Sequence, residues 1–297
     1  MRVNPLPNPD LLTAIEHTQQ EVQTDELQIS SGLSVNVPSD DPAAAALLAQ
    51  NADQISQTDQ FQRSLGSVQG EIQNADSSLN SVITSLQQAI TLGTEGANGT
   101  VNDADRESIA VQVQGIQSQL LSLANLSYQG NYVFSGTATQ TTPYVLDANS
   151  SSGVLYQGNT GVNSITLGDN YTQQTNLPGS QIFSAPGGDV FQSIQDLILG
   201  LQSGNTSSIG AAVTEISNAS DHVNAQAVFY GNALNQLTSQ STYLSTQSTQ
   251  LSQQENTEGA ADLPAVISNL TTAQTSLQAT LEAIAQTSQT NLFSFLR

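Results

Sequence analysis

The sequence predicts a mainly α fold with a small β insertion. Both chain ends should form a long antiparallel helical rod, a coiled-coil-like bundle, with a central β-rich domain. Three observations support this prediction. Apolar residues recur at alternating steps of four and three near both ends, which is the spacing of a heptad seam. Short β-prone runs separated by Gly, Asn, Asp and Ser occupy the middle. Charged residues make up only 10% of the 297 residues, against about 25% in an ordinary soluble domain.

The first long helix should begin at Pro42, because Pro suits the first helical position and Asp41 before it is a good N-cap. Between Phe61 and Ala89 its apolar residues alternate between two positions of the heptad repeat. It should end near Gly93, in a Gly-rich turn. A helix of this length, about 75 Å at 1.5 Å per residue, is too long for a compact globular core.

A second seam follows the capping residues Asn102 and Asp103 and closes before Gly130, so these two helices should form an antiparallel hairpin. A helix from Asp189 to about Leu201 then leads into a long C-terminal one, interrupted near residues 258–260. The expected domains are an N-terminal assembly segment (1–41), a helical hairpin of the rod (42–130), a β-rich central domain (131–186), helices returning along the rod (187–257) and a C-terminal assembly helix (258–297).

The composition excludes several classes of function. Twenty-five acidic residues against four arginines and no lysine give a net charge of −21, which argues against nucleic acid and anionic membrane surfaces as partners. The longest apolar runs are far below the roughly 18 residues that span a bilayer, so no membrane insertion is expected. Cysteine is absent, and the only histidines, His17 and His222, lie in helical patterns. No catalytic, cofactor or metal site is predicted, and the chain is not expected to be an enzyme.

One segment of the sequence carries a distinctive motif. The run from Ile29 to Ala45 contains Ser-Ser-Gly and then Ser39, Asp40, Asp41 and Pro42, and it resembles the N-terminal signature of the flagellin superfamily of bacterial axial proteins. Flagellins proper tend to carry Asp-Asp-Ala-Ala-Gly at this point, whereas Asp-Asp-Pro-Ala resembles the hook-associated members. We predict these four residues to be an assembly motif.

Two further stretches resemble the same hook-associated members. The first is a turn into the central domain, here called the hairpin motif, made of Gly130, Tyr132, Phe134 and Gly136. The second is the C-terminal assembly helix, whose candidate residues are Leu270, Leu277, Leu281, Ile284, Leu292, Phe293, Phe295 and Leu296. The chain departs from the family at two places where relatives often have basic residues: it has Leu33 after Ser-Ser-Gly, and Gln226 with Tyr230 before Gly231.

The resemblance implies a structural subunit of the bacterial flagellum that joins the hook-associated region to the flagellin filament by helix–helix polymerisation. It implies hook-associated protein 1, flagellin, copies of the chain in a ring and a flagellar export chaperone as partners. It also implies an extracellular location at the hook–filament junction, reached by type III export without a cleaved signal peptide. Two alternatives stay open: a short flagellin that forms the filament itself, and an acidic coiled-coil surface adhesin.

Overall fold

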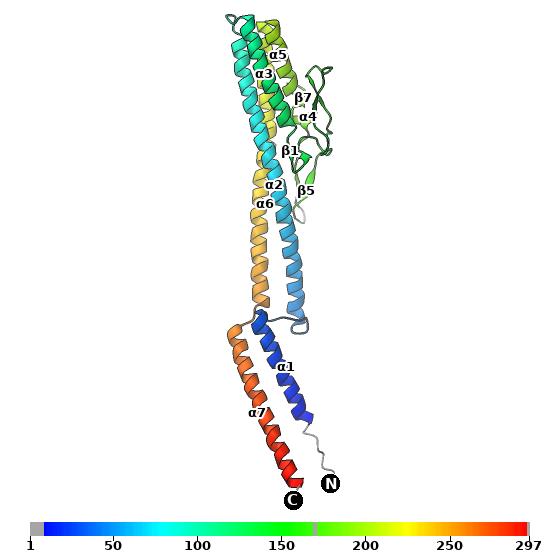
Figure 1. Ribbon diagram of the computed structural model, residues 1–297, viewed down its shortest axis with the longest axis vertical. Coiled ribbons are helices and arrows are strands. Elements are labelled where there is room, and N and C mark those ends of the chain that lie inside the picture. Colours follow the sequence, from blue (N-terminus) through cyan, green and yellow to red (C-terminus); the bar gives the residue numbers. More distant parts are fainter. Residues whose placement is uncertain (1–8, 169–170, 296–297) are drawn as a thin grey trace. The chain divides into compact units, whose positions relative to one another are not determined.

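The computed structural model describes residues 9–168 and 171–295, and the side chains of residues 12–168 and 171–286. The predicted fold class is confirmed: long antiparallel helices dominate, and small β hairpins occupy the middle of the sequence (Figure 1). The helices are α1 (Pro9–Ser31), α2 (Pro42–Gly96), α3 (Asp103–Ala124), α4 (Gly179–Ile182), α5 (Val190–Ser203), α6 (Thr206–Gly259) and α7 (Leu263–Phe295).

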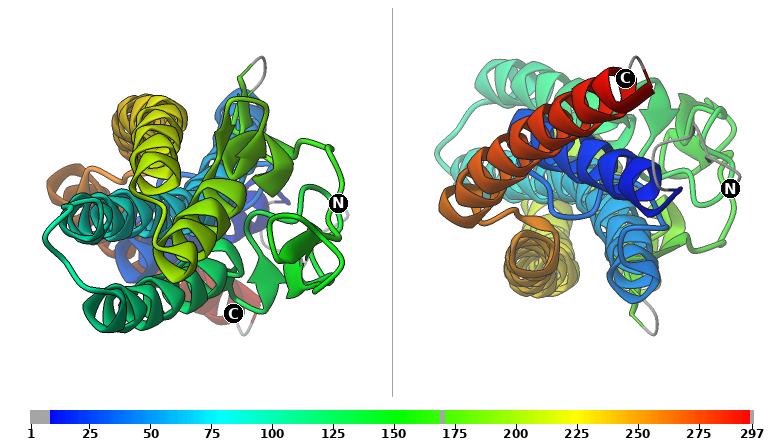
Figure 2. Two further views of the ribbon diagram at one scale, coloured as in Figure 1. Left: turned by 90° about the horizontal axis from the view of Figure 1, so that it is seen from above. Right: turned by 90° about the horizontal axis from the view of Figure 1, so that it is seen from below.

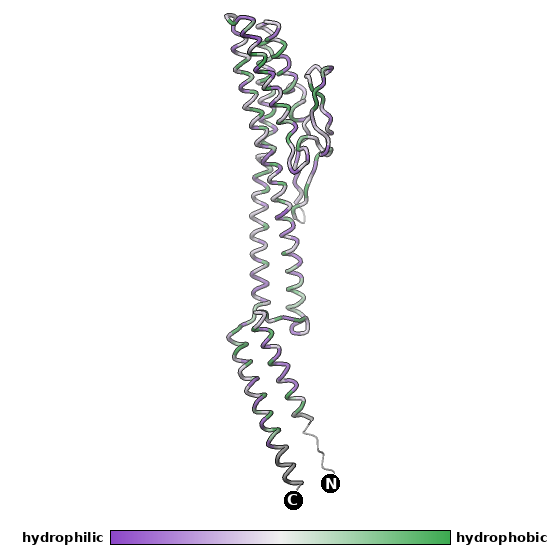
Figure 3. The backbone as a smooth tube through the Cα atoms, in the orientation of Figure 1, coloured by the Kyte–Doolittle hydropathy of each residue, from purple (hydrophilic) through white to green (hydrophobic). Residues whose placement is uncertain are grey.

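The chain divides into two compact units, which are described separately. The end unit holds the chain up to residue 57 and from residue 246 onward, and the central unit holds residues 58–245. Helices α2 and α6 contribute to both units. Along the helices, hydrophobic and hydrophilic residues alternate in short steps (Figure 3), and none of the described helices is long and apolar enough to cross a membrane.

The predicted heptad seam forms the core of the central unit. Both registers of α2 are buried from Leu65 to Ala89, and α6 contributes its own buried series from Val223 to Leu244 at seven-residue spacing. Helices α3 and α5 pack against one another and complete the bundle, in which the four helices lie side by side when viewed end-on (Figure 2). The ordinary burial of an amphipathic face therefore explains these stripes.

The Gly-rich segment after residue 92 differs from the expected turn. Helix α2 continues through Gly93 to Gly96. A Cβ added at Gly93 would overlap Val213 of α6 and meet Leu197 of α5, and one at Gly96 would overlap Leu201 of α5. The glycines therefore let α5 and α6 approach the α2 backbone closely, and close packing outweighs their low helix propensity.

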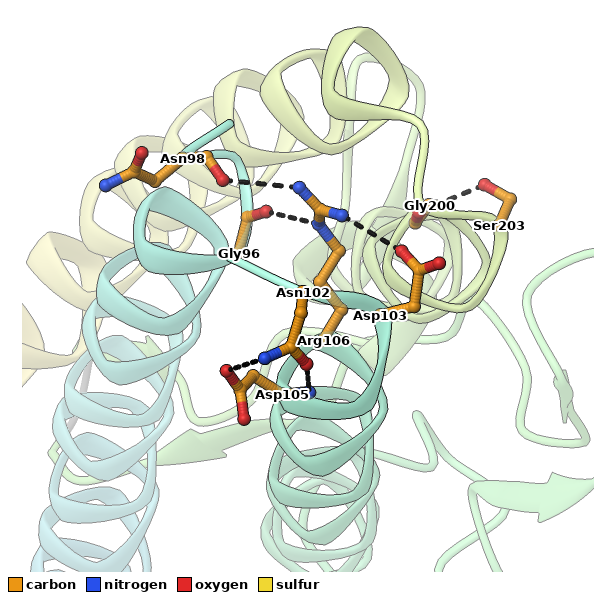
Figure 4. Close-up of polar contacts among 8 residues, drawn as sticks. All are labelled: Gly96, Asn98, Asn102, Asp103, Asp105, Arg106, Gly200 and Ser203. Carbon is orange, nitrogen blue, oxygen red and sulfur yellow. Dashed lines mark hydrogen bonds and ion pairs between the residues drawn. The ribbon is translucent and has the colours of Figure 1, made fainter. Parts of the chain in front are cut away.

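The turn between α2 and α3 is held by Arg106, whose side chain is buried (Figure 4). Its Nε donates to the Gly96 carbonyl at 3.0 Å and its Nη2 to the Asn98 carbonyl at 3.2 Å, while Nη1 lies 3.1 Å from Asp103 Oδ1. These carbonyls belong to the end of α2 and the loop after it, where a helix leaves carbonyl groups without partners. Asn102 caps α3 as predicted, by accepting from the Asp105 N–H.

Within the described residues, the β-rich region consists of four separate antiparallel hairpins rather than one sheet. Their strands are β1 (Ser127–Tyr128) with β2 (Asn131–Tyr132), β3 (Tyr144–Leu146) with β4 (Val154–Tyr156), β5 (Ser164–Thr166) with β6 (Thr172–Gln174), and β7 (Ser184–Ala185) with β8 (Gly188–Asp189). Two-stranded hairpins are marginal alone. They are attached to the bundle by a buried aromatic cluster in which Phe134 meets Phe183 at 5.3 Å and Tyr230 of α6 at 6.5 Å between ring centroids.

In the end unit, α1 and α7 pack against one another in antiparallel fashion. Among the side chains of α7 that the structure describes, up to residue 286, Val266 and Ala273 are buried, one heptad apart. The interruption predicted near residues 258–260 is present, because α6 ends at Gly259 and α7 begins at Leu263.

Candidate assembly surface

The predicted assembly motif builds a turn and starts a helix. Asp41 Oδ1 accepts from the backbone N–H groups of Ala43 and Ala44 at 2.9 and 3.0 Å, which is the N-cap arrangement expected before Pro42. Asp40 Oδ2 accepts from the N–H groups of Asn36 and Val37, both at 3.0 Å, and closes the preceding loop. Ser39, Asp40, Asp41 and Pro42 are all exposed. Their carboxylates are therefore engaged with their own backbone and arranged for shape rather than for acid–base chemistry.

A backbone clasp joins two distant segments of the end unit. The Ser34 N–H donates to the Gly259 carbonyl at 2.8 Å, and the Ala261 N–H donates to the Gly32 carbonyl at 3.0 Å. Leu33 and Ala260 lie between them as an antiparallel bridge. Gly32 ends α1 at φ +74°, the left-handed conformation that glycine adopts most readily. The clasp fixes the end of α1 beside the turn between α6 and α7.

Sequence reasoning missed the clasp, because its two segments lie more than 220 residues apart. The available signal was local: a glycine stands at the end of a helix at each of the two places, in Ser-Ser-Gly and in Glu-Gly-Ala. Leu33, where relatives often have a basic residue, forms the bridge with its backbone and leaves its side chain exposed.

The hairpin motif lies in the central unit, whereas the assembly motif belongs to the end unit. Gln129 and Gly130 have φ of +50° and +83° and form the tight turn between β1 and β2. Tyr132 is half-buried, whereas the Phe134 ring is fully buried in the aromatic cluster. Gly136 has φ +74°, and a Cβ there would overlap the carbonyl of Asn159.

Gln226 and Tyr230, which stand where relatives often have basic residues, contact other residues of their own chain. The Tyr230 hydroxyl accepts from the Leu177 N–H at 3.1 Å, and the buried hydroxyl's pKa is raised by desolvation. The Gln226 Oε1 lies 3.5 Å from the Gln181 Nε2. Neutral hydrogen bonds thus attach the segment after β6 to α6.

The C-terminal assembly helix covers only part of its apolar surface within the chain. Leu270, Leu277 and Ile284 are half-buried, and Leu281 is 50% exposed. Ile267 of α7 is exposed to a similar degree. The side chains of Leu292, Phe293, Phe295 and Leu296 lie outside the described residues. Two helices cannot enclose each other's apolar stripes fully, so α1 and α7 present an incomplete core.

Several titratable groups of the end unit lie along α1. His17 Nδ1 is 3.2 Å from Glu21 Oε1, and burial, with a smaller contribution from Glu21, raises the pKa of Asp25. These residues line a shallow groove with Asn269 and Thr272 of α7. Within residues 9–168 and 171–295, no group of three His, Asp or Glu side chains is arranged to hold a metal ion.

Comparison with known proteins relates these features to a known protein family. The bacterial flagellin N-terminal helical region matches residues 7–139, which include the assembly motif and the hairpin motif. The N-terminal part of the chain thus matches the flagellin family. The predicted resemblance to the hook-associated members is also confirmed.

Flagellar hook-associated protein 3 of Escherichia coli (strain K12) is 32% identical to this chain over 184 residues, covering 62% of the chain and 54% of that protein. The chain thus spans about half the length of this curated relative.

Two solved structures share the fold. FlgL of Bacillus cereus superposes with a TM-score of 0.61 at 21% identity, over 70% of this chain and 99% of that one. The flagellar junction protein FlgL of Legionella pneumophila superposes with a TM-score of 0.59 at 16% identity, over 70% and 99%.

Proposed function

We propose that the chain is a structural subunit of the bacterial flagellum that joins the hook-associated region to the flagellin filament. The similarity to flagellar hook-associated protein 3 carries this proposal. The partly covered apolar surface of α1 and α7 supports it, because a protein that acts by helix–helix polymerisation must leave part of a core for its neighbours to complete. The function needs no catalysis.

The physical basis is the burial of half-exposed side chains at the chain ends. Ile267 and Leu281 lie 14 residues apart on α7, so they project from one side of the helix. Burying a Leu or Ile side chain fully is worth about 1.5–3 kcal/mol, so covering each half-exposed one contributes about 1 kcal/mol. Several such contacts, repeated by every copy, would hold a ring together.

The proposed partners are hook-associated protein 1 on one side, flagellin on the other, further copies of the chain in a ring, and an export chaperone before assembly. The proposed location is outside the cell at the hook–filament junction, reached by type III export. The four exposed assembly-motif residues and the C-terminal assembly helix are the proposed contact regions.

A short flagellin is the second candidate, because the matching family region is the one that flagellins carry at their N-terminus. Deleting the gene distinguishes the two. If the chain is the junction subunit, the mutant should make hooks without filaments and release unassembled flagellin into the medium. A mutant with hooks but no released flagellin would favour the flagellin alternative, and intact filaments would overturn both. Expressing the gene from a plasmid should restore filaments and serves as the control.

A further inference from the structure

Acidic residues are unevenly distributed over the helices of the central unit. From His222 to Ser245, α6 carries no Asp, Glu or Arg, and α3 carries none from Ser108 to Ala124. At 1.5 Å per residue these stretches are about 36 and 25 Å long. A third uncharged stretch lies on α2, from Ser77 to Thr94. In a chain of net charge −21, such lengths of helix without a carboxylate are candidate contact surfaces.

Exposed hydrophobic side chains distinguish two of the three stretches. Val228 and Tyr243 of α6 are 57% and 60% exposed, and Val111 of α3 is 58% exposed. Within the described residues, the α2 stretch exposes no large hydrophobic side chain. We call residues 222–245 of α6 the α6 face and residues 108–124 of α3 the α3 face.

Several exposed hydroxyl groups of both faces already have acceptors. On the α6 face, Thr238, Ser239 and Thr242 donate to the carbonyls four residues earlier at 2.8, 3.0 and 3.1 Å. On the α3 face, Ser108 and Ser118 do the same, both at 3.1 Å. Covering these hydroxyls with another protein surface leaves no orphan donor, so their desolvation costs little.

Together these observations identify an interface. We propose that the α6 face of one copy of this chain contacts the α3 face of the next copy. The proposal rests on the proposed function, which requires copies to assemble side by side, and adds which surfaces meet. The two faces are different, so the contact is head-to-tail and can be repeated around a ring.

Charge favours a second copy over a basic partner as the occupant. Two chains of charge −21 repel wherever their acids approach within the Debye length of about 8 Å at physiological salt. Val228 lies seven residues, about 10 Å, beyond the last acid before the α6 face, Asp221, and Tyr243 lies farther along. A basic partner would instead favour the acid-bearing parts of the surface, such as the first turn of α3.

The α3 face has open space near its middle. Gly115 lies there, and apart from its chain neighbours and the backbone of its own helix nothing lies within 4 Å of the place where its Cβ would be. A large side chain from the neighbouring copy, such as Tyr243, has room to lie against the helix backbone there.

A charge-swap experiment in flagellated cells that produce the full chain tests the pairing. Val228→Glu places a carboxylate on the α6 face, and Ser118→Lys places an ammonium group on the α3 face, well away from Glu107. We expect Val228→Glu to reduce the amount of chain in purified flagella about tenfold, equivalent to about 1.4 kcal/mol. The double variant should recover most of it. Leu199→Glu, at a 52% exposed position of α5 outside both faces, is the matched control and should assemble normally.

Wild-type incorporation of Val228→Glu would overturn the proposal. So would failure of the double variant to recover while circular dichroism shows it folded. If a variant misfolds, crosslinking replaces it: the chain has no cysteine, so Val228→Cys with Ser118→Cys and a bismaleimide should link chains in intact flagella, and Leu199→Cys with Ser118→Cys should not.

The same preparations of purified flagella distinguish the interface proposal from the proposed function. Wild-type chain that is present in flagella without the expected crosslink would refute only the choice of faces. Absence of wild-type chain from flagella would refute the proposed function, and the interface with it.

Discussion

Replacing Arg106 with Met should loosen the turn between α2 and α3. The side chain is 7% exposed and donates to two carbonyls, those of Gly96 and Asn98. Hydrogen bonds to charged groups are worth about 1.5–3 kcal/mol each. Met keeps most of the apolar stem, and water can reach the Asn98 carbonyl in the exposed loop. We therefore expect a loss of about 3 kcal/mol, most of it from the buried bond to Gly96.

Hydrogen exchange of residues 93–110, followed by mass spectrometry in the full chain, measures this loss locally. Since each 1.4 kcal/mol is tenfold, about 3 kcal/mol should raise the opening equilibrium of the turn more than about a hundredfold. Asp103→Asn is the matched control, because it removes only the ion pair of a 92% exposed carboxylate. Such pairs are worth about 0–1 kcal/mol. A similar effect of both variants would refute the assignment of stability to the capped carbonyls.

Three further predictions concern single residues. Gly136→Ala should lower the free energy of unfolding by at least about 2 kcal/mol, because the added Cβ meets both a left-handed backbone and an overlap with Asn159. Gly130→Ala, which has a left-handed backbone but open space around it, should lower it by about 1 kcal/mol. Equal losses of the two variants in urea unfolding would contradict this. Asp41→Ala should cost about 1 kcal/mol and speed hydrogen exchange in the first turn of α2. Asp41→Asn, which keeps an acceptor, should not. Burial raises the pKa of Glu71, so the folded state binds its proton more tightly than the unfolded state does. Stability should therefore fall as pH rises from the ordinary Glu pKa through the raised one, and Glu71→Gln should lose that slope; an unchanged slope would assign it to other groups.

Much of the helical architecture could be predicted from the sequence. The heptad seam of α2, its start at Pro42 and the cap at Asn102 follow from local chemistry that the structure preserves. The runs at Tyr144 and Val154 also pair as predicted strands. These features depend on residues a few positions apart, where periodicity and capping preferences are strong.

Other features depend on contacts between distant segments. Gly93 reads as a turn residue, but tight packing of Leu197 and Val213 keeps it helical. Strand β2 ends at Tyr132, and the ring of Phe134, two residues later, packs into the aromatic cluster. The role of Arg106 was not foreseen, since nothing near it in the sequence marks the carbonyls that it reaches.

The candidate assembly residues came from a resemblance, and the structure adds their local roles. Asp40 and Asp41 shape a turn and a helix start, and Gly130 and Gly136 adopt positive φ. Physical reasoning from one sequence identifies such turns but not the neighbour that a surface will meet. The contact roles of these residues and of the C-terminal assembly helix therefore stay predictions.

The position of the chain on isolated flagella tests the central claim most directly. Gold-labelled antibody against the chain, viewed by electron microscopy, should mark one narrow zone where the hook meets the filament. Label distributed along the filament would contradict the junction role and favour a flagellin, and label absent from flagella would contradict the flagellar function altogether.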